Sequence, residues 1–481
     1  MFIFSSLSHI CLSSAFYDGG KKMEIYLWAE RLCEKINAIL WGPIFSIPML
    51  CIGIWFTVRL GFFQFRGIKM WIGETAGKGF KERKRNKNGI SPYKTLTTAL
   101  AGTMGTGNIV GVASAIAIGG AGSVFWMWVS ALFCMMTKYA ETVLAVKFRK
   151  KNRKGEWEGG AMEYMEYGLG SKRMAVVFGI LCVFASFGMG NMTQANSIAC
   201  ALNETFAIPP ILTGCIMAAL LLFIICGGIK RISSFAEKLI PILSILYILG
   251  GLYVILTHHD RILPSLREIF RQALLPSSAI GGTAGYGIGR AMRYGFSRGI
   301  FSNEAGLGSS GMVYASADDA DPVTQGMWGM FEVFADTIVV CTVTALAILT
   351  GIGYPEANMS GTALTIAAFS SSFGSVGRVI ISLSITLFAF ASIVGWAYYG
   401  ERGMKKAAGE GAGKIYKIIF VMCAILGSVL RLELVWGLSE VFNALMAIPN
   451  LTAVILLSKY VFEESERICR FRKDTGGKCR K

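Results

Sequence analysis

Residues 102–108, GTMGTGN, interrupt a stretch that otherwise reads as a membrane-spanning helix. Three glycines, two threonines and one asparagine in this short stretch weaken a helix. Within a bilayer, backbone groups freed by such an interruption must face protein or water, because lipid cannot hydrogen-bond them. Taken alone, the stretch could equally be a packing device, since small residues let transmembrane helices approach closely. A second interruption farther along the chain is needed to decide between the two.

The composition indicates a membrane protein with many spans. Of its 481 residues, 53% are hydrophobic and only 16% are charged, whereas soluble proteins usually carry about 25% charged residues. The net charge of +17, from 47 Lys and Arg against 30 Asp and Glu, falls in short segments between apolar runs. That distribution is typical of cytoplasmic loops and leaves no room for a nucleic-acid-binding domain.

The cysteines and histidines argue against metal or redox chemistry. The chain has twelve cysteines and three histidines but no C-x-x-C pair, and most cysteines lie inside apolar runs, where Cys behaves as a small hydrophobe. A membrane enzyme would need a nucleophile–base pair or a metal set, and no histidine is placed to supply one. We therefore expect no enzymatic activity and no cofactor.

Apolar runs predict eleven spans, each long enough for roughly 20 residues. They cover about 42–63, 93–118, 122–146, 175–201, 209–228, 236–256, 279–315, 325–350, 376–399, 415–434 and 436–460. An amphipathic stretch precedes the seventh span, and a nearly uncharged loop, residues 354–375, precedes the ninth. Lys and Arg cluster after spans one, three, five and nine and in the tail. This pattern predicts an extracellular N-terminus and a cytoplasmic C-terminus.

The seventh predicted span is too polar to face lipid. Its sequence, GGTAGYGIGRAMRYGFSRGIFSNEAGLGSSGM at 281–312, mixes many glycines with three arginines and Glu304. If the first span is set aside, GTMGTGN interrupts the first of ten helices and FSNEAGLGSS interrupts the sixth. Breaks at matching places in two five-helix halves indicate an inverted-repeat secondary transporter. The fold class is therefore all-α, a polytopic membrane protein of about eleven helices with a five-plus-five core and two broken helices.

The predicted organisation has five parts. They are an N-terminal extension (1–22), an interfacial helix (23–40), an extra leading transmembrane helix (41–65), a ten-helix transporter core (90–460) and a basic cytoplasmic tail (461–481).

A broken helix exposes backbone groups that can bind a small zwitterion and a cation. Free N–H groups at the start of the second half-helix suit a carboxylate, and freed carbonyls suit a hard cation. Glycine permits close approach of a ligand, and Thr and Asn add side-chain oxygens. These candidate residues are Gly102, Thr103, Gly105, Thr106, Gly107 and Asn108.

The intramembrane acids leave two interpretations open. Glu304, in the second break, could act in transport or could pair with Arg298 or with freed N–H groups. Glu332 and Asp336 share a helix face. They could relay protons or bind a cation, or they could pair inside the bundle with the arginines Arg290 and Arg293.

Two further polar stretches offer candidates. In GNMTQAN, residues 190–196, Gln194 and Asn196 could line a pocket or tie helices together. In FAFASIVGWAYYG, residues 388–400, Ser392 and Trp396 lie one turn apart. An intramembrane Trp is often a packing or interface residue, so its role also stays open.

Five motifs, in order, resemble the alanine or glycine:cation symporters, the sodium:alanine symporter family. They are ALAGTMGTGNIVGVASAIAIGGAGSVFWMWV, GNMTQANSI, RGIFSNEAGLGSS, FADTIVVCTVTAL and GWAYYGE. The resemblance runs from about residue 28 to the eleventh span. It implies the ten-helix inverted-repeat fold with one leading helix. It also implies sodium-driven uptake of alanine or glycine through a bacterial or archaeal cytoplasmic membrane.

The resemblance also implies roles for individual residues. Substrate contacts would come from Gly105, Thr106, Gly107, Asn108, Gln194, Phe301 and Trp396, with Trp396 capping the small side chain. Ser392 would complete a sodium site with carbonyls near Gly102 and Gly105. The chain departs from the family pattern at Thr283 and Glu332, which leaves the exact substrate open.

Other transport mechanisms remain to be weighed. A channel would need rings of equivalent filter residues, whereas this chain offers two unlike breaks. Within the carriers, proton coupling is the rival to sodium, because Glu304, Glu332 or Asp336 could carry protons.

Overall fold

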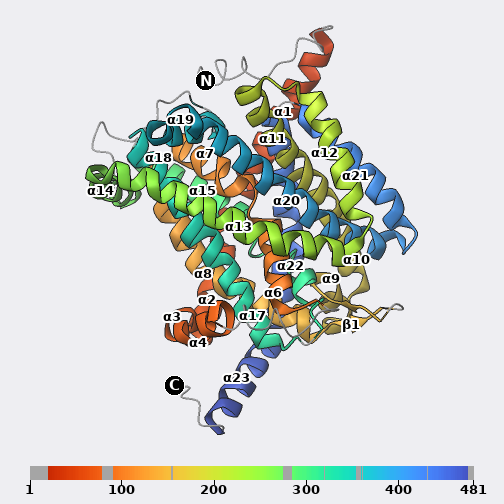
Figure 1. Ribbon diagram of the computed structural model, residues 1–481. Helices are drawn as coiled ribbons and strands as arrows, with labels where there is room; N and C mark the ends of the chain where they lie inside the picture. The colour runs from red at the N-terminus through yellow and green to blue at the C-terminus, as the bar shows by residue number, and fades with distance from the viewer. Residues whose placement is uncertain are drawn as a thin grey trace.

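The computed structural model describes residues 20–77, 90–152, 155–274, 284–318, 320–353, 359, 361–430 and 432–474. These residues form a bundle of helices, to which one short two-stranded hairpin is added (Figure 1). Residues 1–19 of the predicted N-terminal extension, and the end of the predicted tail beyond 474, lie outside the described residues.

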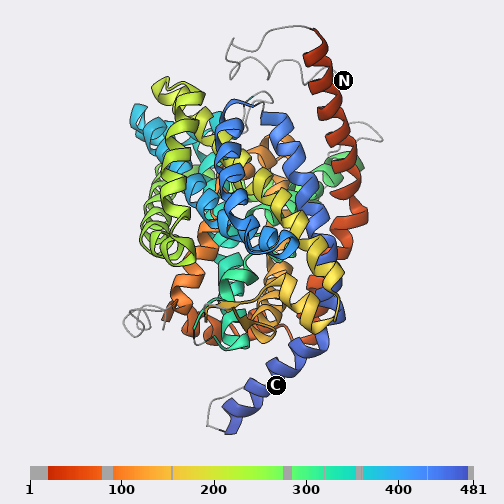
Figure 2. The ribbon, with the colours of Figure 1, turned by 90° about the vertical axis from the view of Figure 1, so that its right-hand side faces the viewer.

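A leading pair of helices precedes the bundle. Helices α1 (Gly20–Leu40) and α2 (Pro43–Arg59) run end to end along one side (Figure 2), and Leu27–Arg59 is apolar and long enough to count as one span. The division into an interfacial helix and a separate leading span therefore stays a prediction. After α2 the chain reverses at Gly61 and Phe62, both with positive φ. It continues through α3 (Phe63–Arg66), α4 (Ile68–Ile72) and η3 (Gly73–Gly77).

The first half of the core begins with the broken helix. It comprises α6 (Pro92–Thr103), η4 (Thr106–Asn108), α7 (Val110–Gly119), α8 (Gly122–Lys147), β1 (Lys150–Lys151), β2 (Trp157–Glu158), α9 (Ala161–Glu163), η5 (Tyr164–Gly168), α10 (Lys172–Phe187), η6 (Gly188–Met192), α11 (Thr193–Phe206), α12 (Pro210–Ile225) and α13 (Gly228–Thr257). Strands β1 and β2 pair antiparallel between α8 and α10.

The second half follows a short connection. It comprises η7 (His259–Arg261), α14 (Ile262–Leu274), α15 (Ala284–Asn303), α16 (Gly311–Tyr314), α17 (Pro322–Val333), η8 (Phe334–Cys341), α18 (Thr342–Gly351), α19 (Gly361–Phe373), α20 (Ser375–Ala408), α21 (Ala412–Val429), α22 (Leu432–Leu456) and α23 (Ser458–Asp474).

The eleven predicted spans correspond to helices in the structure. In its described part, eight helices are long and apolar enough to cross a membrane, or nine with the bent pair α6 and α7 counted as one. The two other predicted spans are α12, which is apolar but short, and α15, whose sequence is too polar to count as an apolar span. The two halves pack against each other, with α8 against α15 and α17, and α10 against α20.

One predicted loop is a helix. We expected residues 354–375 to form a loop, but residues 361–373 form α19, while 354–358 and 360 lie outside the described residues. Helix α19 packs on α7, α18 and α20, where Leu364, Ala368 and Phe369 are buried. Its lack of charge therefore reflects packing against the bundle.

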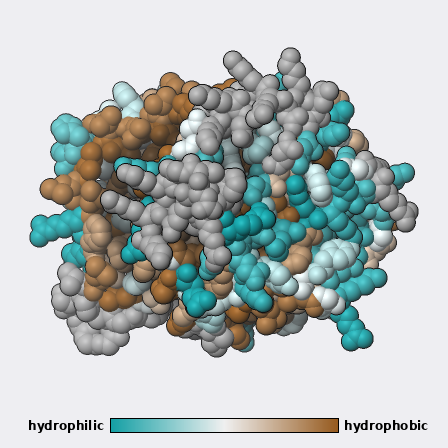
Figure 3. Space-filling model, turned by 90° about the horizontal axis from the view of Figure 1, so that it is seen from below, coloured by the Kyte–Doolittle hydropathy of each residue, from teal (hydrophilic) through white to brown (hydrophobic). Residues whose placement is uncertain are grey.

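The ends of the bundle differ in character. Helix α23 leaves the body at the end where the C-terminus lies (Figures 1 and 2). Seen from that end, hydrophilic residues gather over the centre and right of the view, while hydrophobic residues gather mainly at its upper left (Figure 3).

A buried ion pair joins the two halves. The Lys138 ammonium on α8 lies 3.3 Å from Glu332 Oε1 on α17 and donates to Asn303 O at 3.0 Å. Tyr314 OH donates to the other Glu332 oxygen at 3.0 Å. Of the interpretations left open for Glu332, pairing with Arg290 or Arg293 is therefore wrong. Lys138 already supplies the compensating charge from the helix that α17 packs against.

This pair should matter for stability. Replacing Lys138 by Met leaves Glu332 as an uncompensated buried charge, which typically costs about 3–5 kcal/mol. Lys138→Met/Glu332→Gln should recover much of that loss, because Gln removes the charge and keeps an acceptor for Tyr314. Unfolding of the detergent-solubilised protein measures both variants, with exposed Lys172→Met as the control. A wild-type melting curve for Lys138→Met would contradict this account.

Candidate functional site

The first break, residues 104–109, separates α6 from α7. The two half-helices are bent by 61° relative to each other, and a single 3₁₀ turn at 106–108 joins them. Gly105 has φ −118° and ψ −142°, a conformation far from helical. The bend frees backbone groups near the middle of the span, as GTMGTGN predicts.

Three helices converge on the first break. A Cβ added at Gly105 would lie 2.7 Å from Gln194 Oε1 and 3.0 Å from Ser392 Oγ. Gln194 Oε1 accepts a hydrogen bond from Thr106 N at 2.9 Å, and Ser392 Oγ donates to Gly102 O at 2.6 Å. The structure thus brings together four of the predicted site residues around Thr106, from α6, α11 and α20.

Glycine lets α20 approach α6 closely. A Cβ at Gly395 would lie 3.0 Å from the Gly102 Cα, so a larger residue would push the helices apart. A Cβ at Gly102 would in turn lie 3.1 Å from the Tyr399 hydroxyl. Tyr399 was not among the predicted residues, although Ser392, Trp396 and Tyr399 share one helix face at i, i+4 and i+7.

Two side-chain oxygens in the first break have no partner. Thr106 Oγ1 and Asn108 Oδ1 are buried, and neither has a hydrogen bond within the described part of the chain. Buried polar groups are normally satisfied, so such exceptions call for an explanation. Such unpaired oxygens, beside freed backbone carbonyls, could accept hydrogen bonds from an ammonium group or bind a cation.

Asn108 also anchors the break to the π-helical segment η8. Its Nδ2 donates to Asp336 Oδ1 at 2.7 Å, while Ser302 and Thr337 donate to Asp336 Oδ2 at 2.7 and 2.9 Å. Of the interpretations left open for Asp336, pairing with an arginine is wrong, because neutral donors from η4, α15 and η8 itself bind its carboxylate. Short π-helical segments frequently occur at functional sites.

The second break, residues 304–310, follows α15. Glu304, Gly306 and Gly308 all have positive φ, which is uncommon for a residue such as Glu. The helix that follows, α16, spans only residues 311–314, so the second half-helix is much shorter than that of the first break. Thr283, before α15, lies outside the described residues.

Glu304 is held by neutral donors. Trp396 Nε1 donates to its Oε1 at 2.7 Å, and Ser309 Oγ donates to its Oε2 at 2.6 Å. Arg298 is instead paired with Glu440 on α22 at 2.7 Å, so pairing of Glu304 with Arg298 is wrong. Trp396 packs against Gly190, where an added Cβ would lie 2.4 Å from its ring.

Aromatic rings cover the first break on the α15 side. The Phe301 ring lies 3.4 Å from the position of a Cβ at Gly107 and stacks on Trp436 of α22 at 5.0 Å. The Arg298 guanidinium also lies over the Trp436 ring, 4.7 Å from the ring centroid. Trp436 was not predicted, and no sequence signal links it to Phe301.

The two polar candidates in GNMTQAN have different roles. Gln194 faces the first break, as described above. Asn196 Nδ2 donates to Gly427 O and Leu430 O at 2.9 and 2.8 Å, which ties α11 to the end of α21. The two side chains face different neighbours because residues two positions apart on a helix do not share a face.

Comparisons with known proteins agree with this architecture. The profile of the sodium:alanine symporter family matches residues 26–478. The sodium/alanine symporter AgcS of Methanococcus maripaludis is 39% identical over 452 residues, covering 92% of this chain and 98% of AgcS. The probable sodium/glutamine symporter GlnT of Bacillus subtilis is 37% identical over 451 residues, covering 92% and 91%.

A solved structure supports the fold. MhsT, solved in complex with L-phenylalanine, matches with a TM-score of 0.53 at 12% identity, covering 78% of this chain and all of MhsT. Likeness at that identity concerns the fold alone, which is the predicted five-plus-five inverted repeat. The matching profile and relatives show that this chain belongs to the sodium:alanine symporter family, and hence that it is a multi-pass membrane protein for cation-coupled amino-acid symport and not an enzyme.

Proposed function

We propose that this protein imports small neutral amino acids, alanine and glycine, driven by the sodium gradient across a bacterial or archaeal cytoplasmic membrane. The observation that carries the proposal is the pair of buried side-chain oxygens at the first break, Thr106 Oγ1 and Asn108 Oδ1, which have no hydrogen-bond partner among the described residues. The close packing of Gln194 and Ser392 around Gly105 supports a small substrate. In this proposal the N-terminus is outside and the C-terminus is cytoplasmic, as the Lys and Arg clusters predict.

The substrate would lie at the first break. Its carboxylate would face the start of α7, where free N–H groups and the helix dipole favour an anion. Its ammonium group would face unpaired oxygens such as Thr106 Oγ1. The Phe301 ring, which lies next to Gly107, would form the wall that faces the side chain of the substrate. Trp396 would support the site from the side away from the substrate, because its indole donates to Glu304 and packs against Gly190.

The sodium ion would lie between α6 and α20. The Ser392 hydroxyl and the Gly102 carbonyl are 2.6 Å apart and adjoin Gly105, so their oxygens already converge. Turning the hydroxyl hydrogen away would let both oxygens face one cation. Neutral oxygen ligands suit a hard cation and bury no additional charge.

Uptake into proteoliposomes tests the proposal as a whole. Labelled alanine should accumulate when an inward sodium gradient is imposed, and unlabelled glycine or alanine should compete. Each methylene is discriminated by about 1–3 kcal/mol in a fitted pocket, so leucine and phenylalanine should compete poorly. Glutamine is a necessary competitor, given the name of one relative. Strong inhibition by glutamine or leucine would overturn the small-substrate proposal.

Proton coupling is distinguished in the same experiment. If uptake follows a proton gradient with no sodium present, sodium coupling is wrong. Glu304 and Asp336, both buried beside the breaks, then become the carboxyl groups to replace by Gln and Asn.

Gly105→Ala tests the position of the substrate. The added methyl would contact Gln194 Oε1 and Ser392 Oγ, so alanine uptake should fall at least tenfold, equivalent to about 1.4 kcal/mol. Gly111→Ala is the matched control, because its Cβ would meet only contacts of 3.8 Å or more. Uptake is compared at equal amounts of folded protein, because the methyl at Gly105 also crowds the Gln194 oxygen that accepts from Thr106 N. Equal uptake by the two variants would place the substrate elsewhere.

Ser392→Ala tests the sodium site. It removes one neutral ligand, so the half-saturating sodium concentration should rise while high sodium restores uptake. Because sodium and substrate binding are thermodynamically linked, apparent alanine affinity at low sodium should weaken too. Ser384→Ala is the control, since Ser384 lies on the same helix and bonds only its own backbone at Ile380 O. An unchanged sodium dependence in Ser392→Ala would refute this site.

A further inference from the structure

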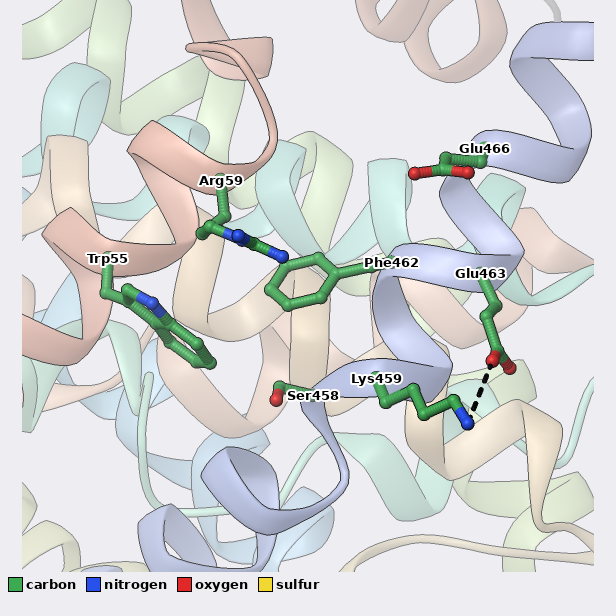
Figure 4. A pocket seen from close by; sticks show the side chains of 7 residues that line it. All are labelled: Trp55, Arg59, Ser458, Lys459, Phe462, Glu463 and Glu466. Atoms are coloured by element: carbon green, nitrogen blue, oxygen red, sulfur yellow. Dashed lines mark ion pairs between the residues drawn. The ribbon is translucent and has the colours of Figure 1, made fainter.

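A cavity that contains no residue of the two breaks lies where the leading helix meets the C-terminal helix. Its volume is about 460 Å³, within the range typical of small-molecule sites. Side chains from the end of α2 and from the first turns of α23 line it (Figure 4). Phe462 forms its base, with its ring 5.6 Å from Trp55 and 5.0 Å from the Arg59 guanidinium.

The α23 wall is held in place from behind. Glu464 pairs with Lys147 of α8 at 2.6 Å, and Ser465 hydrogen-bonds Tyr139 of α8 at 2.7 Å. These contacts fix the face of α23 opposite the cavity. Glu463 and Glu466 are thereby left on the side that lines it, which Figure 4 shows.

Charges of both signs surround the cavity. Arg59 and Lys459 supply positive charge, and Glu463 and Glu466 supply negative charge. Lys459 is 3.8 Å from Glu463. No carboxylate of the described residues is recorded within ion-pair distance of Arg59, whose guanidinium lies on the Phe462 face. A ligand that carries both an anion and a cation would complement these walls.

The cavity also lies at the edge of an apolar surface. On α2, Ile47, Trp55 and Val58 are exposed, and α2 is part of a candidate span that ends at Arg59. Trp and Arg at the end of a span are typical of the level of lipid headgroups. An acyl chain could therefore follow the exposed face of α2 while its headgroup enters the cavity.

We propose that this cavity binds the headgroup of phosphatidylethanolamine. The phosphate diester would accept hydrogen bonds from Arg59, Lys459 and the Ser458 hydroxyl, since guanidinium and ammonium groups bind phosphate well. The primary ammonium of the headgroup would donate to Glu463 or Glu466. A choline headgroup has no N–H to donate, and a glycerol headgroup carries no positive charge for the carboxylates.

Binding would join the leading helix to the C-terminal helix. The lipid would contact α2 through Arg59 and Trp55 and α23 through the acidic side chains. Because a ligand that binds only the folded state stabilises it, phosphatidylethanolamine should raise the melting temperature of the protein.

Thermal unfolding of the purified full-length chain in mixed micelles tests the proposal. At equal mole fraction, phosphatidylethanolamine should raise the melting temperature more than phosphatidylcholine or phosphatidylglycerol. Water-soluble glycerophosphoethanolamine at the same concentration should give no shift, because it lacks the chain that packs along α2. Equal shifts from the three lipids, a larger shift from phosphatidylglycerol, or a full shift from the soluble headgroup would each overturn the proposal.

Single substitutions locate the effect. Arg59→Gln should abolish the rise in melting temperature that phosphatidylethanolamine causes. Arg66 is exposed and lies a short distance along the chain, so Arg66→Gln should keep that rise. If Arg59→Gln already melts lower without lipid, Glu466→Gln serves instead and should reduce the preference over phosphatidylcholine. An unchanged preference in Glu466→Gln, or an unchanged increment in Arg59→Gln, would show that the lipid binds elsewhere.

Discussion

A helix interrupted inside a bilayer needs partners for its freed backbone groups, because neither lipid nor a continuous helix can supply them. Here Gln194 accepts from Thr106 N, and Ser392 donates to Gly102 O. These two bonds come from different helices, so α11 and α20 must both lie against the first break. The requirement for satisfied hydrogen bonds therefore determines which helices surround the site, and the small residues Gly102 and Gly395 let them come close enough.

The same requirement links the two breaks through a shared polar network. Asn108 of the first break and Ser302 at the end of α15 both donate to Asp336. Nearby, Lys138 contacts both Asn303 O, where α15 ends, and Glu332. Asp336 is thus bonded both to the first break and to the end of the helix that leads into the second. A carrier that binds ion and substrate together needs a connection of this kind between its two broken helices.

A second group of contacts lies between α15 and α22. Phe301 stacks on Trp436, Arg298 lies over the same ring, and Arg298 pairs with Glu440. Charged groups of this kind are rarely placed inside a membrane bundle without a partner. Because one face of Phe301 lies next to Gly107, these contacts close the bundle beside the first break.

The sequence alone determined the fold class and both breaks, since span length, polarity and glycine content follow from local composition. It also identified Gly102, Gly105, Gln194 and Ser392, which converge in the structure. Only the tertiary structure decided the partners of the buried charges. Arg298 pairs with Glu440, and Lys138 pairs with Glu332, whereas the sequence had left Arg290, Arg293 and Arg298 open as partners of the buried acids. An ion pair depends on which helix faces lie together in space, and that is set by packing between segments far apart in the sequence.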